Sequence, residues 1–175
     1  QASLFRHQVD YIAALGVAAG LFFAWQSAVV VNDLFDLESD RLSNRERPLV
    51  RGTFDRDEYK LLGAVFFVLA VAFAYTASYG SFLMVLTFWA FYFIYSAPPF
   101  RLKRFFPVNM LLVVANGLMV FLAGLALVGQ WTTYSLVTWK AVFLVTVPYI
   151  LGVHIITLKD VEGDRADGVK TLPVL

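Results

Sequence analysis

Val29–Gly52, VVVNDLFDLESDRLSNRERPLVRG, is the stretch where an apolar run gives way to a dense group of charges. Within it, spacings of one, three and four residues separate Asn32, Asp33, Asp36 and Asp40. On a helix that continues through the stretch, residues three and four apart lie on one face. Carboxylates clustered at the end of a helix are opposed by the negative end of its dipole and by their mutual repulsion. We therefore expect a cation to hold them together.

A second acidic motif near the end of the chain repeats this pattern with Asp160, Asp164 and Asp167. Both motifs come where a long apolar segment ends. Sets of oxygen ligands suit magnesium, which keeps several waters and takes other ligands from substrate phosphates. The sequence therefore predicts a Mg²⁺ site for a phosphorylated substrate. Asp36 and Asp164 are the expected central ligands, because each has acidic neighbours about one turn away on both sides.

The composition indicates that a membrane surrounds these motifs. Hydrophobic residues make up 59% of the chain, more than the roughly half that is usual for soluble domains. Each of five segments is long enough to span the hydrocarbon core: Tyr11–Val31, Leu61–Tyr79, Ser81–Phe100, Val108–Val128 and Trp139–Leu158. The second and third are joined only by a tight turn around Gly80, so we expect a hairpin. The first segment carries Gly16 and Gly20, a spacing that favours close helix packing.

The first residues of the chain and its lack of cysteine exclude several further features. QASLFRHQVD, the first ten residues, lack the basic start and short apolar core of a signal peptide, and the missing initiator Met suggests a fragment. Cysteine is absent, which excludes disulfides, thiolate nucleophiles and sulfur-ligated metals.

Charges divide unequally between the two sides of the predicted bundle. All lysines and arginines except Arg6 and Lys140, and all acids except Asp10, lie in the loops after the first and third segments or after the fifth segment. The positive-inside rule makes that side cytoplasmic. Both acidic motifs therefore face each other on the cytoplasmic side.

Basic and aromatic residues accompany the motifs. Guanidinium groups suit phosphate oxygens, so Arg45, Arg47 and Arg51 are candidates for contact with a ligand. The alternative is that they only mark the cytoplasmic side of the membrane. Pro98 and Pro99 are expected to end the third segment, and Arg101, Lys103 and Arg104 follow. An aromatic stripe on that segment, Phe88, Tyr92 and Tyr95, is either ordinary packing or a surface whose ring faces stabilise a cation.

Four motifs together resemble the UbiA superfamily of intramembrane prenyltransferases: NDLFDLESD (32–40), RERP (45–48), YSAPPFRLK (95–103) and DVEGDRADGVKTLP (160–173). The resemblance implies an all-α, multi-pass transmembrane bundle in which residues 1–175 form a single membrane domain. It also implies that this chain supplies helices two to six of a nine-helix fold.

The resemblance implies Mg²⁺-dependent transfer of a prenyl group from a prenyl diphosphate to a lipophilic acceptor through an allylic carbocation. The implied metal ligands are Asn32, Asp33, Asp36, Asp40, Asp160 and Asp164. Those assigned to the diphosphate are Asn32, Arg45, Arg47, Lys103 and Lys159, and those assigned to catalysis are Asp36, Asp164, Lys103 and Tyr95. The expected setting is an integral membrane protein with its active site on the cytoplasmic face and no nucleic-acid partner.

Three other classes of protein remain as alternatives. A CDP-alcohol phosphotransferase also uses aspartates at a membrane surface, but its compact signature is missing from the sequence. An ion transporter would be expected to carry acids near the middle of its spans rather than at their ends. A non-catalytic homologue is the third alternative, although the intact motifs favour an enzyme.

Overall fold

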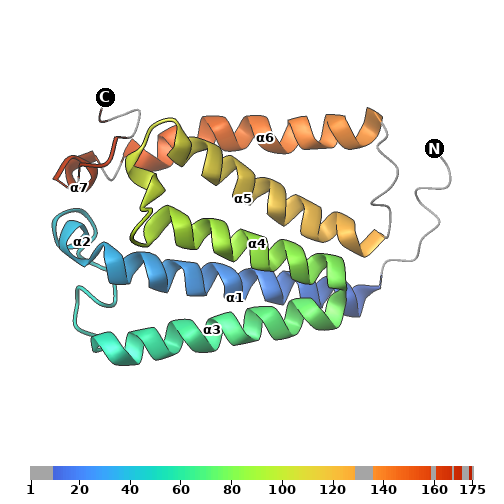
Figure 1. Ribbon diagram of the computed structural model, residues 1–175, viewed down its shortest axis with the longest axis horizontal. Coiled ribbons are helices and arrows are strands. Elements are labelled where there is room, and N and C mark those ends of the chain that lie inside the picture. Colours follow the sequence, from blue (N-terminus) through green and yellow to red (C-terminus); the bar gives the residue numbers. More distant parts are fainter. Residues whose placement is uncertain (1–9, 129–135, 159–160, 167, 171–173, 175) are drawn as a thin grey trace.

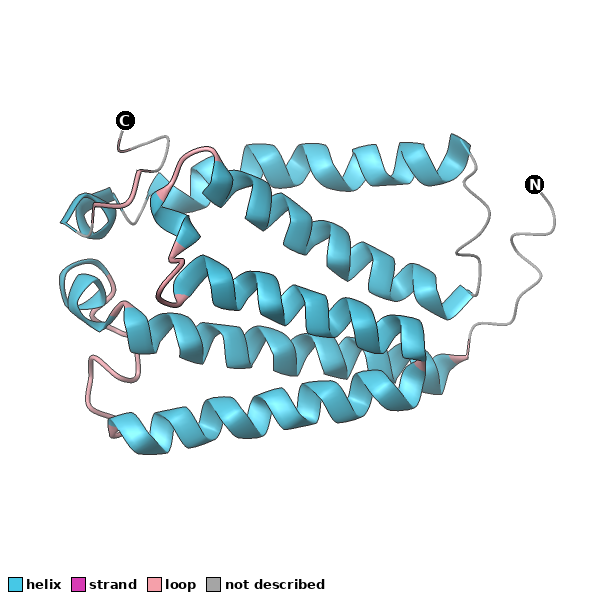
Figure 2. Ribbon diagram, viewed as in Figure 1, coloured by secondary structure: helices cyan, strands magenta, loops and turns pink. Residues whose placement is uncertain are grey.

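The computed structural model describes residues 10–128, 136–158, 161–166, 168–170 and 174, and every regular element among them is helical (Figure 2). Five long helices lie side by side (Figure 1): α1 (Tyr11–Phe35), α3 (Arg56–Ala77), α4 (Tyr79–Ser96), α5 (Val108–Leu125) and α6 (Leu136–Thr157). The shorter elements are α2 (Leu37–Ser43), α7 (Val161–Ala166) and two 3₁₀ turns, η1 (Leu102–Arg104) and η2 (Ala126–Val128). Each of the five expected segments thus forms a helix.

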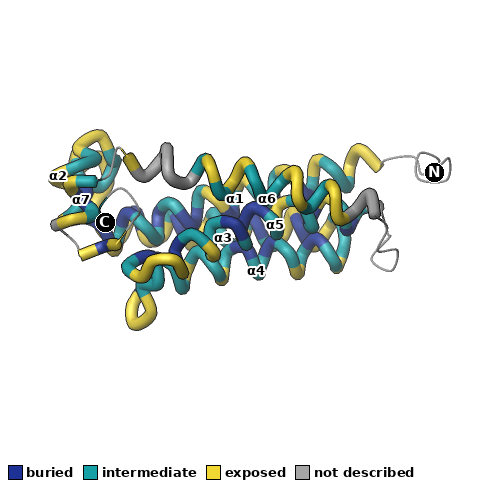
Figure 3. Tube along the Cα trace, turned by 90° about the horizontal axis from the view of Figure 1, so that it is seen from above, coloured by how far each residue is buried: buried dark blue, intermediate teal, exposed yellow. Residues whose placement is uncertain are grey.

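Length and hydropathy make α1, α3, α4 and α5 able to cross a membrane, while α6 contains a shorter apolar stretch, Trp139–Gly152. Large apolar side chains are exposed along the outside of the bundle, while the buried residues lie between the helices (Figure 3). An apolar exterior of this kind is suited to lipid. The predicted all-α membrane bundle is confirmed.

Small residues bring α1 and α3 close together. A Cβ atom added to Gly20 would lie 3.1 Å from the Ala74 Cβ, and one added to Gly16 would lie 3.2 Å from the Ala77 Cβ. Further along, Ser27 Oγ donates a hydrogen bond of 2.9 Å to the Gly63 carbonyl. The close approach expected from Gly16 and Gly20 is therefore confirmed.

The hairpin between α3 and α4 turns at one residue, Ser78, and not around Gly80 as predicted. Ser78 is extended, and its Oγ accepts a hydrogen bond of 2.9 Å from Ser81 N. Because this bond satisfies an amide at the start of a helix, α4 begins at Tyr79 and Gly80 lies in its first turn. The other end of α4 is also earlier than expected, at Ser96 rather than Phe100, because a residue that precedes proline disfavours helical backbone and Ala97 is extended.

The described parts of the sequence motifs lie at one end of the bundle. In Figure 1, α2, α7, the start of α3 and the connection from α4 to α5 lie at the left, whereas the α3–α4 turn lies at the right. The α3 helix starts there with a capping box, in which Asp55 accepts bonds from the Asp57 and Glu58 amides and Glu58 accepts one from the Asp55 amide. The fold therefore gathers both acidic motifs and the basic segments at one end.

Candidate active site

The first acidic motif does not lie on one continuing helix, as the spacing had predicted, because the chain bends at Asp36. This residue has φ −108° and ψ 11° and separates α1 from α2. Hydrogen bonds still cross the bend: Asp36 N donates to Asn32 O (2.9 Å) and Asp40 N donates to Asp36 O (2.8 Å). The helix therefore changes direction at Asp36 while its pattern of backbone hydrogen bonds is nearly continuous.

Arginine side chains bind the carbonyl groups left over where α1 ends. Arg101 Nη2 donates to the Phe35 carbonyl at 3.4 Å, and Arg56 Nη2 lies 3.5 Å from the Leu34 carbonyl. The last carbonyls of a helix have no partner within the helix and carry partial negative charge. External donors at these positions therefore support the end of α1 at Phe35.

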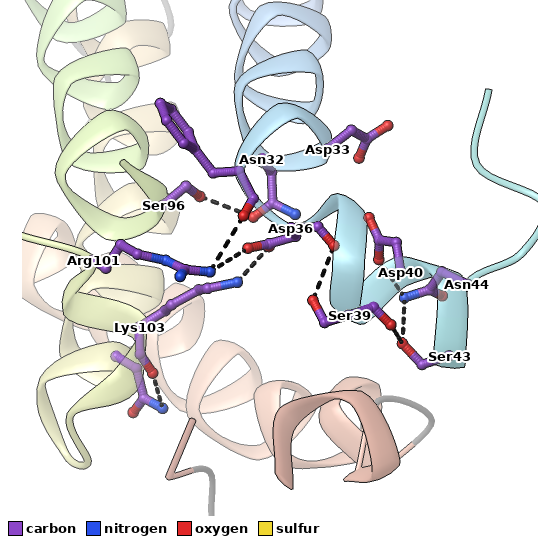
Figure 4. Close-up of polar contacts among 12 residues, drawn as sticks. Asn32, Asp33, Asp36, Ser39, Asp40, Ser43, Asn44, Ser96, Arg101 and Lys103 are labelled. Carbon is purple, nitrogen blue, oxygen red and sulfur yellow. Dashed lines mark hydrogen bonds and ion pairs between the residues drawn. The ribbon is translucent and has the colours of Figure 1, made fainter. Parts of the chain in front are cut away.

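The motif's side chains point in different directions (Figure 4), because adjacent residues of a helix face different sides. Asn32 and Asp36 are directed toward α4 and η1, and Asn32 Oδ1 accepts a hydrogen bond of 2.9 Å from Ser96 Oγ. Asp33 points away from them. The four residues thus form separate contacts at the end of α1.

Asp36 lies between two cations. Arg101 Nη2 is 2.9 Å from Asp36 Oδ1, and Lys103 Nζ donates to Asp36 Oδ2. Both Asp36 and Lys103 are buried. Since burying an unpaired charge is costly, each of these groups depends on the others. The first acidic motif and YSAPPFRLK are thus joined by direct ion pairs, which the sequence analysis did not predict.

Asp40 keeps one carboxylate oxygen free of hydrogen bonds. Its Oδ1 accepts a bond of 3.0 Å from Asn44 Nδ2, while its Oδ2 is buried without a hydrogen-bond partner. Burial raises the pKa of the Asp40 carboxyl to about 6, although the Asn44 hydrogen bond and the Arg47 charge act in the opposite direction. A buried carboxylate oxygen that lacks a donor is suited to a hard cation such as Mg²⁺.

The second acidic motif is packed against the first. A Cβ atom added to Gly163 of α7 would lie 2.5 Å from Ser43 Oγ and 3.4 Å from the Ser39 carbonyl of α2. Asp164 is partly buried on α7, and its carbonyl accepts a hydrogen bond of 2.8 Å from Val169 N. This contact between α2 and α7 places the described part of the second motif beside the first, and the facing of the two sets of aspartates stays a prediction.

Three predicted residues of this region, Lys159, Asp160 and Asp167, lie outside the described residues. In the part of the chain that is described, no group of three or more His, Cys, Asp or Glu side chains is arranged to hold a metal. The metal-ligand assignments therefore remain predictions.

The basic residues differ in how close they come to the acids. Arg47 Nη1 lies 3.2 Å from Asp33 Oδ1. Arg51 instead pairs with Glu46 at the surface, at 3.2 Å, and Arg45 is exposed. The structure thus brings Arg47 and Lys103 to the first motif, but not Arg45 or Arg51.

Asn109 is a site residue that the sequence did not single out. Its Nδ2 donates to the carbonyls of Lys103 (3.2 Å) and Lys170 (3.3 Å), and Lys170 N donates to Arg104 O (3.3 Å). It therefore ties η1, which carries Lys103, to the segment after the second motif. The only signal in the sequence is a polar residue at the start of an apolar helix.

Arg101 and Tyr59 were also not predicted as site residues. Arg101 contacts Asp36, as described above, and its place inside YSAPPFRLK could have indicated it. Tyr59 donates to Asp33. Nothing in the local sequence distinguishes Tyr59 from an ordinary interfacial tyrosine.

The aromatic stripe on α4 is confirmed. Ring centroids are 5.6 Å apart for Phe88 and Tyr92 and 6.0 Å apart for Tyr92 and Tyr95, and Trp25 of α1 lies 6.2 Å from Tyr92. Phe88 also belongs to the buried core. The rings thus lead from the core toward Ser96, which contacts Asn32.

Comparison with known proteins adds to this geometry. The family model described as UbiA prenyltransferase family matches residues 4–175. Digeranylgeranylglyceryl phosphate synthases are similar: that of Sulfurisphaera tokodaii is 29% identical, covering 83% of this chain and 51% of the relative, and that of Thermococcus gammatolerans is 30% identical, covering 95% and 55%. The chain thus spans about half the length of these relatives.

Solved structures of a UbiA homologue from Archaeoglobus fulgidus share the fold. The structure bound to DMAPP and Mg²⁺ has a TM-score of 0.81 and 24% identity, covering 95% of this chain and 59% of that one. The structure bound to GPP and Mg²⁺ has the same TM-score and identity. At this identity, the likeness establishes a common arrangement of helices.

Proposed function

Because the chain belongs to the UbiA prenyltransferase family, we propose that it takes part in transferring a prenyl group from a prenyl diphosphate to a lipophilic acceptor. The observation that carries the proposal is the buried pair of Asp36 and Lys103, with Arg101 beside it, at the end of the bundle where α2 meets α7. Buried opposite charges at a membrane-protein surface are suited to a charged ligand headgroup whose tail lies among apolar helices.

The acidic residues of the site are suited to the metal, and the basic residues are suited to the diphosphate. We assign Mg²⁺ to oxygen ligands of both motifs: Asn32, Asp36, Asp40, Asp160 and Asp164. Lys103 and Arg47 lie beside the first motif and would bind diphosphate oxygens, with Arg45 and Lys159 as further candidates. When bound, Mg²⁺ supplies positive charge that stabilises the departing diphosphate.

Transfer begins with cleavage of the bond between C1 of the prenyl group and the diphosphate oxygen. The electron pair leaves with the diphosphate, whose charge Lys103 and Arg47 neutralise, and an allylic cation remains. The Tyr92 and Tyr95 rings exclude water and offer their faces to this cation. An acceptor oxygen or ring carbon then bonds to C1, and the proton that the acceptor loses passes to the released diphosphate.

The names of the relatives support one class of acceptor. Because several are named as digeranylgeranylglyceryl phosphate synthases, we assign a glyceryl phosphate lipid with a free hydroxyl as the acceptor in preference to an aromatic ring. The protein is an integral membrane protein, and the distribution of charge supports a cytoplasmic active site. The CDP-alcohol phosphotransferase alternative loses its support, since the family match covers almost the whole chain.

The test is a transfer assay with the full chain in liposomes. Labelled prenyl diphosphates from dimethylallyl to geranylgeranyl would be offered with glyceryl phosphate lipids, aromatic acceptors and, separately, a CDP-alcohol. We expect prenylated glyceryl phosphate, with activity lost on chelation of Mg²⁺ and restored by its addition. Transfer to aromatic acceptors alone would overturn the acceptor assignment, and release of CMP, or no transfer to any acceptor, would overturn the proposed reaction.

A further inference from the structure

Asp33 contacts a tyrosine of α3 and an arginine of the following segment, and not the two cations that hold Asp36. Tyr59 Oη donates to Oδ2 at 2.8 Å, and Arg47 Nη1 lies 3.2 Å from Oδ1. Asp33 is 1% exposed and Tyr59 is 3% exposed. In Figure 4, Asp33 points away from Asn32 and Asp36. Asp33 Oδ1 accepts no hydrogen bond, so its contact with Arg47 is an ion pair.

We propose that Asp33 is a positioning residue and not a metal ligand: together with Tyr59 it fixes Arg47, and with it the 44–55 segment, beside the diphosphate site. This inference rests on the proposed function only in naming diphosphate as the ligand of Arg47. Asp33 therefore acts through Arg47.

Tyr59 connects three parts of the chain. It belongs to the first turns of α3, its hydroxyl contacts Asp33 on α1, and its ring centroid lies 5.7 Å from that of Phe54 in the preceding segment. If Asp33 turned toward a metal, the buried Tyr59 hydroxyl would lose its acceptor. An unsatisfied buried donor is costly, so the present orientation of Asp33 is strongly favoured.

Arg47 is a suitable point at which to hold the whole segment. Its carbonyl accepts a hydrogen bond of 3.0 Å from Arg51 N, and its amide donates one of 3.0 Å to Asn44 O. Thr53 N donates to Pro48 O at 3.0 Å, which closes the next turn. Because these bonds join neighbouring turns, fixing the Arg47 side chain limits the motion of the segment around it.

The Arg47 guanidinium also remains able to reach a ligand. Its side chain is 33% exposed, in contrast to its buried partner Asp33. A guanidinium group has five N–H donors in a fixed fork, so one edge can bind Asp33 while another binds phosphate oxygens. Asp33 would then orient the fork without touching substrate.

The experiment compares Tyr59→Phe and Asp33→Asn with Tyr75→Phe, a control on the exposed part of the same helix. The full chain lacks cysteine, so a spin label at Thr53→Cys reports motion of the segment. Each variant in liposomes would also be titrated with Mg²⁺ and with geranylgeranyl diphosphate, and Asp36→Asn would serve as the metal-ligand reference.

We expect Tyr59→Phe to increase the mobile fraction of the spin label and to raise KM for the prenyl diphosphate about tenfold, with a smaller fall in kcat and a Mg²⁺ requirement near that of wild type. Asp33→Asn should act in the same direction, whereas Tyr75→Phe should leave all four quantities unchanged. If Tyr59 and Asp33 only stabilised the fold, their variants would lower the amount of folded protein without raising KM more than they change kcat.

A rise in the Mg²⁺ requirement of Asp33→Asn equal to that of Asp36→Asn, with an unchanged label in Tyr59→Phe, would overturn the proposal. Failure of the proposed function is distinguishable, because wild type would then show no Mg²⁺-dependent turnover of prenyl diphosphate. The spin-label comparison would still decide whether Tyr59 and Asp33 hold the segment.

Discussion

Arg101 has an unfavourable backbone conformation, and contacts of its side chain offset the energetic cost. Its φ is +39°, in the left-handed region, where a residue other than glycine costs about 1–2 kcal/mol. Its guanidinium contacts both the Phe35 carbonyl and Asp36 Oδ1. Because hydrogen bonds to charged groups contribute about 1.5–3 kcal/mol, these two contacts offset the strain.

Arg101→Gly tests this balance, since glycine removes the strain and the side chain together. We expect the thermal unfolding midpoint to fall rather than rise, because the lost contacts outweigh the relieved backbone, and prenyl transfer to fall with it. Arg101→Lys should retain part of the activity, since it keeps the charge but not the fork. A higher midpoint with full activity in Arg101→Gly would show that the side chain is unimportant.

At the residue level, spacing predicted the groups but not their partners. Spacing selected Asp36 and the family resemblance selected Lys103, and the structure brings the two together. The contacts of Arg101 with Phe35 and of Tyr59 with Asp33 join residues 66 and 26 positions apart. Such pairs depend on how helices pack, which a local pattern does not specify.

The contact between α2 and α7 joins the two acidic motifs, and Gly163 permits it. Gly163→Ala would place a methyl group 2.5 Å from Ser43 Oγ and 3.0 Å from Ser43 Cβ. We expect α7 to shift away from α2 and prenyl transfer to fall at least about tenfold, since small misplacements of catalytic groups are costly.

Matched variants separate this effect from a general loss of helix packing. Gly124→Ala adds a methyl group where no atom lies within 4 Å, so transfer should remain normal. Adding Ser43→Ala to Gly163→Ala removes the nearest clash and should restore part of the activity. Equal activity in Gly163→Ala and wild type would mean that this contact does not set the distance between the motifs.

At the level of elements, the sequence predicted the helices better than their ends. Apolar runs gave all five long helices, but the α3–α4 turn falls at Ser78 and α4 ends at Ser96. Both ends depend on a side-chain cap or on the residue before a proline, which hydropathy does not register. The bend at Asp36 was missed for a related reason, because the groups that bind the end of α1 come from distant segments.

At the level of the whole molecule, opposite ends of the bundle should face opposite sides of the membrane. Thr53 is exposed at the end that carries the motifs, and Tyr79 is exposed at the α3–α4 turn. With a membrane-impermeant thiol reagent applied from outside intact cells, we expect labelling of Tyr79→Cys and not of Thr53→Cys. The opposite pattern would place the active site outside and contradict the charge-based topology.

The central claim is that both acidic motifs act together on one Mg²⁺–diphosphate complex. The most direct measurement is turnover of prenyl diphosphate by the full chain as Mg²⁺ is increased, in Asp36→Asn, Asp164→Asn and the exposed control Glu38→Gln. Each asparagine keeps the shape and removes one charge, so both variants should fold while losing about two to four orders of magnitude in rate. Glu38→Gln should match wild type, and near-normal turnover by either asparagine variant would contradict the account.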